Sequence, residues 1–136
     1  MPRVSAAFFA LGAVCVFMGM LWGMHMGESE DFTMMPAHAH LNLLGWVSLF
    51  LFGIFYHLHP AIDRSRTASV QVWIWIASTV ILTIGVGLVH TGHAIGDPIA
   101  AIGSIIILAD MLLFGWLVVR REAVKADARH SVVPAE

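Results

Sequence analysis

The amino-acid sequence predicts an all-α integral membrane protein, a four-helix bundle with both termini in the cytoplasm. Hydrophobic residues make up 59% of the 136 residues and charged residues only 12%, which leaves too little polar surface for a water-soluble domain. Four apolar runs, at about 5–25, 36–58, 67–91 and 98–119, are each long enough to cross a hydrocarbon core, which takes about 20 helical residues. We therefore expect residues 1–121 to form one transmembrane domain and residues 122–136 a short, loose polar tail in the cytoplasm.

Glycine, proline and cap residues mark the ends of these runs. Gly27 can end the first helix, Pro36 suits the first turn of the second, and Pro60 stops the second helix, because proline lacks the backbone donor that a helix interior requires. The pair Asp97 and Pro98 predicts an N-cap followed by proline at the first helical position of the fourth helix. The first run is too long for a signal peptide and no small-residue cleavage site follows it, so we interpret it as a helix.

The basic residues predict the orientation of the chain in the membrane. Lys and Arg are confined to one side of the four runs, whereas the loops on the opposite side carry only acidic charges, namely Glu28, Glu30, Asp31 and Asp97. Because cytoplasmic loops carry the excess of Lys and Arg, both termini are expected in the cytoplasm. We expect the protein to lie in a lipid bilayer, in the bacterial inner membrane, and to have no nucleic-acid partner.

Five of the eight histidines are predicted to share one layer of the membrane. His25 closes the first helix, His38 and His40 open the second, and His90 and His93 close the third, so topology brings them to the outer third of the bilayer. An ionisable side chain inside a membrane segment is costly and usually marks a relay, a pathway or a ligand site. Imidazole is also the commonest nitrogen ligand of haem iron and copper. We therefore expect at least two of the five to serve as ligands.

The two remaining histidines of the second helix belong to the opposite side of the membrane. His57 and His59 lie roughly 25 to 29 Å from His40 along a helix that rises 1.5 Å per residue. For these two, and for His25 and His93, an ordinary interfacial role is the alternative to ligation, because imidazole tolerates the membrane boundary. The functions of His57 and His59 therefore stay open.

The spacing of His38 and His40 has a geometric consequence. Residues two apart in a helix project about 200° from each other, so these two histidines do not bind one ion together but can serve two different centres. Asn42, one turn beyond His38, can hold that imidazole by its second nitrogen, as metal-ligating histidines usually require. Gly45 beneath it leaves room for a flat group.

Two further features leave alternatives open. Asp110 is a carboxylate in the middle of the fourth run, where it is either protonated, paired or facing a wet cavity, so both a proton-linked role and a hydrogen bond to a neighbouring helix are open. The methionines of the outer end can be copper ligands or side chains that fill apolar gaps. They are Met18, Met20, Met24, Met26, Met34 and Met35.

One stretch carries a family resemblance. It runs AHAHLNLLGWVS over residues 37–48 and continues through Gly53 to YHLHP at 56–60. This stretch resembles the histidine-bearing helices of the haem-copper oxidase catalytic subunit (subunit I) and its nitric oxide reductase relatives. In that family such helices carry haem-iron ligands near the outer side of the membrane, and a His-x-His pair supplies one ligand to each of two haems. The resemblance implies that His38 and His40 are haem ligands in a small stand-alone four-helix relative.

The departures from that family limit the expected activity. Its catalytic subunit is built as three four-helix arcs, and its copper site draws histidines from helices that have no counterpart here. We therefore expect a haem-holding unit rather than full oxygen reduction by one copy of the chain, and leave open whether the protein is an oxidoreductase.

The sequence thus favours a membrane protein that binds haem b for electron transfer, redox chemistry or binding of a diatomic gas, with an unspecified electron donor. The absence of a Cys-x-x-Cys-His motif argues against covalent c-type haem. His38, His40, His90 and His25 are the candidate axial ligands, and His93, Asn42 and Gly45 complete the candidate cofactor-binding set. The alternatives are a protein that binds or transports copper or another metal ion, and a cofactor-free assembly subunit of a larger oxidase.

Ligands on both faces of one helix also predict assembly. Four helices do not enclose every histidine, so at least one of His38 and His40 is expected to face a neighbouring chain or a cofactor between chains. The spacing of Gly19 and Gly23 permits close approach between membrane helices, and closed cyclic symmetry is the usual outcome. Because the oxidase subunit resembles three arcs around a pseudo-threefold axis, we favour a homotrimer, with a homodimer as the alternative.

Overall fold

The computed structural model describes residues 3–130, with side chains described for residues 3–119, and this part of the chain is helical and contains no strand. The elements follow in the order α1 (Val4–Ser29), α2 (Met35–Asn42), the π-helix η1 (Leu43–Ser48), α3 (Leu49–His57), α4 (Pro60–Asp63), α5 (Arg66–His90) and α6 (Gly96–His130). Four stretches are long and apolar enough to cross a membrane: Val4–Ser29, Met35–His57, Arg66–His90 and Gly96–Val119. The predicted all-α fold with four spans is therefore confirmed, as expected for an integral membrane protein.

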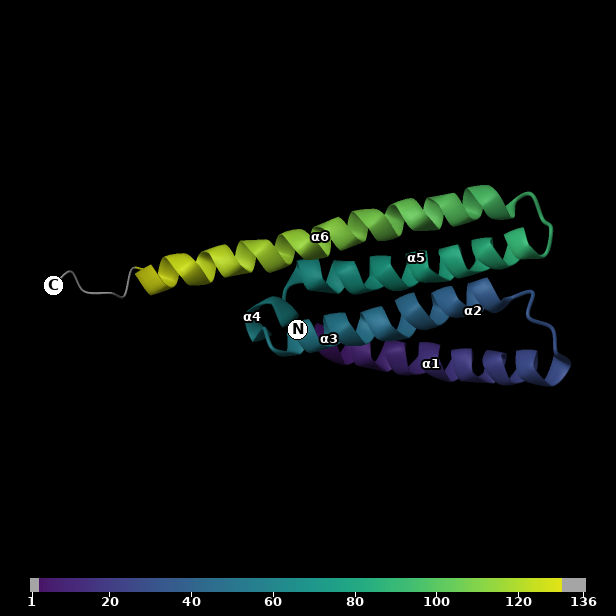
Figure 1. Cartoon of the computed structure of the whole chain (residues 1–136). Helices are drawn as coiled ribbons and strands as arrows, with labels where there is room; N and C mark the ends of the chain where they lie inside the picture. Colours follow the sequence, from purple (N-terminus) through teal and green to yellow (C-terminus); the bar gives the residue numbers. More distant parts are fainter. Residues whose placement is uncertain (1–2, 131–136) are drawn as a thin grey trace.

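The four spans run alternately up and down, in chain order, side by side (Figure 1). The α1–α2 and α5–α6 connections lie at one end of the bundle, α4 and the N-terminus lie at the other end, and the last part of α6 extends beyond the bundle. Glycines set the close approach of α5 to α6, because a Cβ atom at Gly85 would overlap the backbone of Ala100 and one at Gly103 would lie 2.8 Å from the backbone nitrogen of Leu82. Small residues let membrane helices pack this closely.

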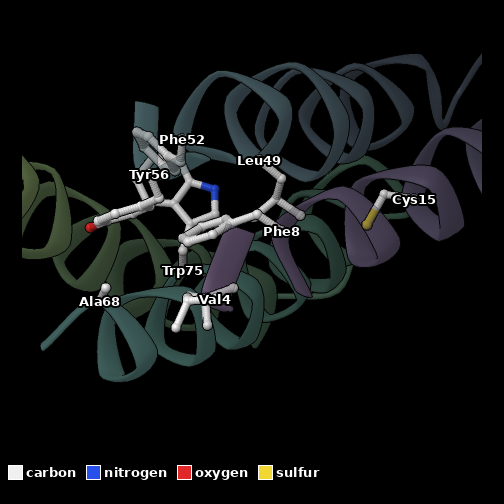
Figure 2. Packing of buried hydrophobic residues seen from close by; sticks show 9 residues of the cluster. Val4, Phe8, Cys15, Leu49, Phe52, Tyr56, Ala68 and Trp75 are labelled. Atoms are coloured by element: carbon white, nitrogen blue, oxygen red, sulfur yellow. The ribbon is translucent and has the colours of Figure 1, made fainter. Parts of the chain in front are cut away.

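An aromatic core holds the half of the bundle that contains α4. Phe8, Phe52 and Tyr56 gather around the fully buried Trp75 (Figure 2). The rings of Phe52 and Trp75 meet edge to face with centroids 4.7 Å apart, an arrangement that adds about 0.5–1.5 kcal/mol beyond the area that it buries. This core joins α1, α3 and α5 and thereby holds together the helices that continue into the histidine-bearing half.

Several helices end or begin at other residues than the sequence predicted. Helix α1 passes through Gly27 and ends before Glu30, which takes a left-handed conformation with φ 55°, so His25 lies inside the helix and does not close it. Helix α6 continues through residues 122–130, where a loose tail was expected, and residues 131–136 of that tail lie outside the described residues. Helix α5 begins where Ser65 accepts a hydrogen bond of 3.1 Å from the Ala68 amide.

The short helix α4 is tied to α1 by a buried carboxylate. Asp63 accepts hydrogen bonds from the backbone amide of Ser5 at 2.6 Å and from its hydroxyl at 2.9 Å. A negative charge at the first turn of a helix is stabilising, because the amides there are unpaired and positively polarised. The sequence did not predict this contact, because Asp63 and Ser5 are 58 residues apart.

Candidate functional site

A π-helical turn divides the second span into a histidine half and an aromatic half. It covers Leu43–Ser48 and interrupts the α-helical pattern directly after Asn42. The indole N–H of Trp75 donates a 2.9 Å hydrogen bond to the Leu44 carbonyl within this turn, and the Ser48 hydroxyl donates to the Leu43 carbonyl at 2.9 Å. Short π segments are rare and occur often at functional sites. The π turn therefore lies next to His38 and His40, in the region where the sequence predicts ligands.

His40 lines an apolar groove and presents one free ring nitrogen. Its Nδ1 lies 2.7 Å from the Pro36 carbonyl oxygen, and because a carbonyl oxygen only accepts, Nδ1 must carry the proton of this bond. In the neutral form of the ring, the lone pair then lies on Nε2, and this is the form that binds metals. Few orientations of His40 are compatible with this bond, so the ring is held in place before any ligand arrives.

The groove beside His40 is bounded by α2, η1, α5 and α6 and has a volume of about 560 Å³. Small-molecule and cofactor sites typically have about 300–1,000 Å³, so the groove is in the right range for an organic cofactor. Its lining is Pro36, Ala39, His40, Leu43, Leu44, Ser48, Trp75, Leu82, Ser104, Ile107, Leu108 and Met111. Apart from His40, two serines and the indole of Trp75, which is bonded to Leu44, this lining is apolar.

His38 faces a different neighbour, helix α1. A Cβ atom at Gly23 would lie 3.2 Å from Cε1 of the His38 ring, and the Trp22 ring stands edge to face with His38 at a centroid distance of 6.1 Å. The prediction that His38 and His40 point to opposite faces is thus confirmed. His38 packs against α1 of its own chain, whereas His40 borders the groove.

The predicted companion of His38 is also found. The Asn42 amide nitrogen lies 3.2 Å from Nε2 of His38 and donates to the His38 carbonyl at 2.9 Å. A Cβ atom at Gly19 would overlap this amide group. Gly19 and Gly23 therefore accommodate Asn42 and His38 within the chain, where the sequence had suggested contact with a neighbouring chain.

The sequence predicted open space for a flat group in front of Gly45, but this space is filled. A Cβ atom there would lie 2.8 Å from the sulfur of Cys15, and Cys15 is itself buried. The sequence hypothesis that placed a cofactor over Gly45 is wrong for this packing, because α1 fills that side of the second span. The open volume lies on the opposite face, beside His40.

The other three histidines of the outer layer remain separate. His90 donates from Nδ1 to the Val86 carbonyl at 2.9 Å, His93 contacts the Thr91 hydroxyl at 3.0 Å, and both are exposed, as is His25. Among the side chains that the structure describes, no group of three or more His, Cys, Asp and Glu residues is arranged to hold a metal ion. Within the described residues, the histidines of this layer thus form no site with three or more ligands.

Two of the outer methionines fill apolar space within the chain. The Met34 methyl group lies 2.8 Å from the position that a Cβ atom of Gly87 would take, and Met26 is buried.

At the opposite end of the bundle, His57 is exposed. His59 lies against Phe55, with a ring centroid distance of 4.3 Å, and contacts the Phe55 carbonyl. These contacts are those of packing and of a helix end.

A buried polar chain runs from Tyr56 through Gln71 to Asp110. The Tyr56 hydroxyl donates to Gln71 Oε1 at 2.7 Å, and Gln71 lies close enough to Asp110 for their side chains to interact. Gln71 Nε2 and both Asp110 carboxyl oxygens nevertheless lack a hydrogen-bond partner of normal geometry. Each such orphan costs about 1–3 kcal/mol, which a proton, a water molecule or a small ion shared between Asp110 and Gln71 would recover. The sequence singled out Asp110 but not Tyr56 and Gln71, which are its companions in the fold.

The outer loops carry a fixed negative charge. Hydrogen bonds from Thr33 hold the pKa of Asp31 below its ordinary value, and the neighbouring His25 adds to this effect. The hydrogen bond that the Thr33 backbone N–H donates to the Asp31 carboxylate measures 3.0 Å. This carboxylate therefore stays ionised over the whole physiological range.

Comparisons with family models, with curated proteins and with solved structures found no match. The residues of this chain offer one histidine with a free Nε2 beside an apolar groove, a second histidine packed against α1, and a buried polar chain that ends in a carboxyl group. The first arrangement is suited to axial ligation of a flat metal cofactor, and the last is suited to holding a proton.

Proposed function

We propose that this chain is a membrane protein that binds haem b in the groove beside His40. The observation that carries the proposal is the hydrogen bond from His40 Nδ1 to the Pro36 carbonyl. Metal-ligating histidines almost always donate their second ring nitrogen to a carbonyl or carboxylate, which fixes tautomer and orientation. The apolar groove of about 560 Å³ supplies the surroundings that the faces of a porphyrin require.

The residues of the groove would have different roles in binding the cofactor. His40 would supply an axial ligand, and Leu82, Ile107 and Leu108 would exclude water from the cofactor. Trp75 holds the π turn through the Leu44 carbonyl and thereby fixes the backbone that forms one wall. A bound haem would supply one-electron chemistry at its iron, with the pocket deciding between electron transfer and gas binding.

The second axial position distinguishes the uses of such a site. His40 is the only histidine that lines the groove in the described part of the chain, while His38 packs against α1. A haem held by His40 would therefore receive no second histidine from the described lining of the groove, and would bind a diatomic gas or a residue of a second copy of the chain. The latter favours the homotrimer or homodimer inferred from the sequence, and the resemblance to the haem-copper oxidase catalytic subunit supports the choice of haem.

The spectrum of the purified protein tests the proposal. We expect protein expressed with a haem supply and purified in mild detergent to be red, with a strong Soret band and a reduced-minus-oxidised spectrum of haem b. His40→Ala should lower the ratio of haem to protein severalfold, because the iron loses its axial ligand, while His57→Ala, at the opposite end, should not. The sequence also predicts a loss of haem for His38→Ala.

A colourless protein with stoichiometric copper would favour the metal-ion alternative, and a colourless, metal-free protein would favour the assembly subunit. Unchanged haem content in both His38→Ala and His40→Ala would refute the ligand assignment. Native mass spectrometry of the red protein decides assembly. A monomer with its full haem complement would refute the shared site.

A further inference from the structure

A second cavity lies at the end of the bundle opposite the His40 groove. It has a volume of about 480 Å³ and is formed by the first turns of α1 and the beginning of α5. Arg3, Arg64, Ser65 and Ser69 provide its polar lining, and Trp73 lies among its apolar walls. None of these residues belongs to the histidine site, and the proposal below does not depend on haem binding.

The two arginine side chains bring positive charge that the described part of the protein does not neutralise. Neither guanidinium group forms an ion pair or a hydrogen bond with a described side chain. The carboxylate next to Arg64 in the chain, Asp63, is buried and directs its two oxygens to Ser5. Among the side chains described for residues 3–119, none therefore supplies the anion that would balance these two arginines.

The hydroxyl groups of the cavity favour an oxyanion. Ser65 accepts a hydrogen bond from the Ala68 amide through its oxygen, which leaves its O–H proton free to be donated. Guanidinium groups match phosphate oxygens in geometry and form charge-assisted hydrogen bonds with them. Arg3, Arg64 and Ser65 thus present several donors, and the described lining of the cavity contains no carboxylate.

We propose that this cavity binds the phosphate headgroup of an anionic phospholipid. The site lies at the ends of two membrane-spanning helices, at the depth where headgroups begin. Trp73 is 60% exposed and lies about one turn beyond Ser69 along α5, so an acyl chain can continue along the apolar wall. Tryptophan is enriched at this depth of membranes, and basic pockets between spans on the side with excess Lys and Arg are suited to anionic lipid headgroups.

Lipid retention in the full chain tests the proposal. The protein is purified in mild detergent, and phosphatidylglycerol or phosphatidylcholine with identical acyl chains is titrated in and counted by native mass spectrometry. An arginine near a membrane surface contributes about fivefold to the binding of an anionic lipid, so the pair should give a preference of about 30-fold for phosphatidylglycerol. This comparison requires no variant. Equal retention of the two lipids would refute the proposal.

The variants locate the site. Arg3→Gln and Arg64→Gln should each lower the preference about fivefold, whereas Arg66→Gln, which removes the same charge at the same end but outside this cavity, should leave it unchanged. An equal loss in Arg66→Gln would show diffuse attraction and overturn the site. Inorganic phosphate is the final probe. If it displaces phosphatidylglycerol at equal concentration, the apolar wall contributes nothing and the lipid assignment is wrong.

Discussion

Replacing Gly19 with alanine should destabilise the bundle, because the new methyl group would overlap the Asn42 side chain. A Cβ atom at Gly19 would lie 2.7 Å from the Asn42 amide nitrogen and 2.8 Å from its Cγ, well inside normal contact distance. Overpacking a closely packed site costs about 1–3 kcal/mol, while alanine gains roughly 0.5–1 kcal/mol over glycine in a helix. The net loss for Gly19→Ala is therefore between about 0 and 2.5 kcal/mol, with a middle value of about 1 kcal/mol.

Gly27 provides the matched control within the same helix. No atom lies within 4 Å of the position that its Cβ would take, so Gly27→Ala should stabilise the protein by roughly 0.5–1 kcal/mol. The assay is unfolding in detergent followed by circular dichroism, with both variants prepared in parallel. Opposite signs for the two substitutions are the expected result.

A double-mutant cycle separates this overlap from other effects. Asn42→Ala removes the side chain that the Gly19 methyl group would meet, so Gly19→Ala should cost less in that background than in the wild type. The coupling should be about 1 kcal/mol or more. If Gly19→Ala is as well tolerated as Gly27→Ala, or if its cost is unchanged without Asn42, the close fit between α1 and the second span is refuted.

Three further predictions concern carboxyl groups. Asp63→Ala should cost about 1–3 kcal/mol, seen as a lower unfolding midpoint, since Ser5 loses both bonds, and an unchanged midpoint would contradict the capping role. Asp110→Asn should keep the fold and haem content but flatten the pH dependence of the haem potential, because an amide takes up no proton; an unaltered dependence would leave only a structural role. The Asp31 carboxyl should titrate by NMR below its ordinary value of 3.8, with Thr33→Val raising the midpoint. Its stabilising effect is complete above 3.8 and is lost as the pH falls through the lowered pKa; a midpoint that Thr33→Val leaves unmoved would exclude the hydrogen bond as the cause.

Local features of the sequence are sufficient to predict the class of the protein and the directions of its two central histidines. Apolar run length predicts the spans, because crossing the hydrocarbon core requires a fixed number of helical residues. The period of the helix also places His38 and His40 on opposite faces and Asn42 beside His38, and all three contacts are found. These are local properties, set by 3.6 residues per turn.

Which neighbour each face of a helix contacts depends on the packing of the whole bundle. Helix α1 covers His38 and fills the space at Gly45 with Cys15, while His40 is left beside the open groove. The π turn depends in the same way on a partner far along the chain, since Trp75 binds its Leu44 carbonyl. A helical period gives the direction of a side chain from its own axis, but its neighbour depends on how separate spans pack, and that packing is a property of the whole bundle.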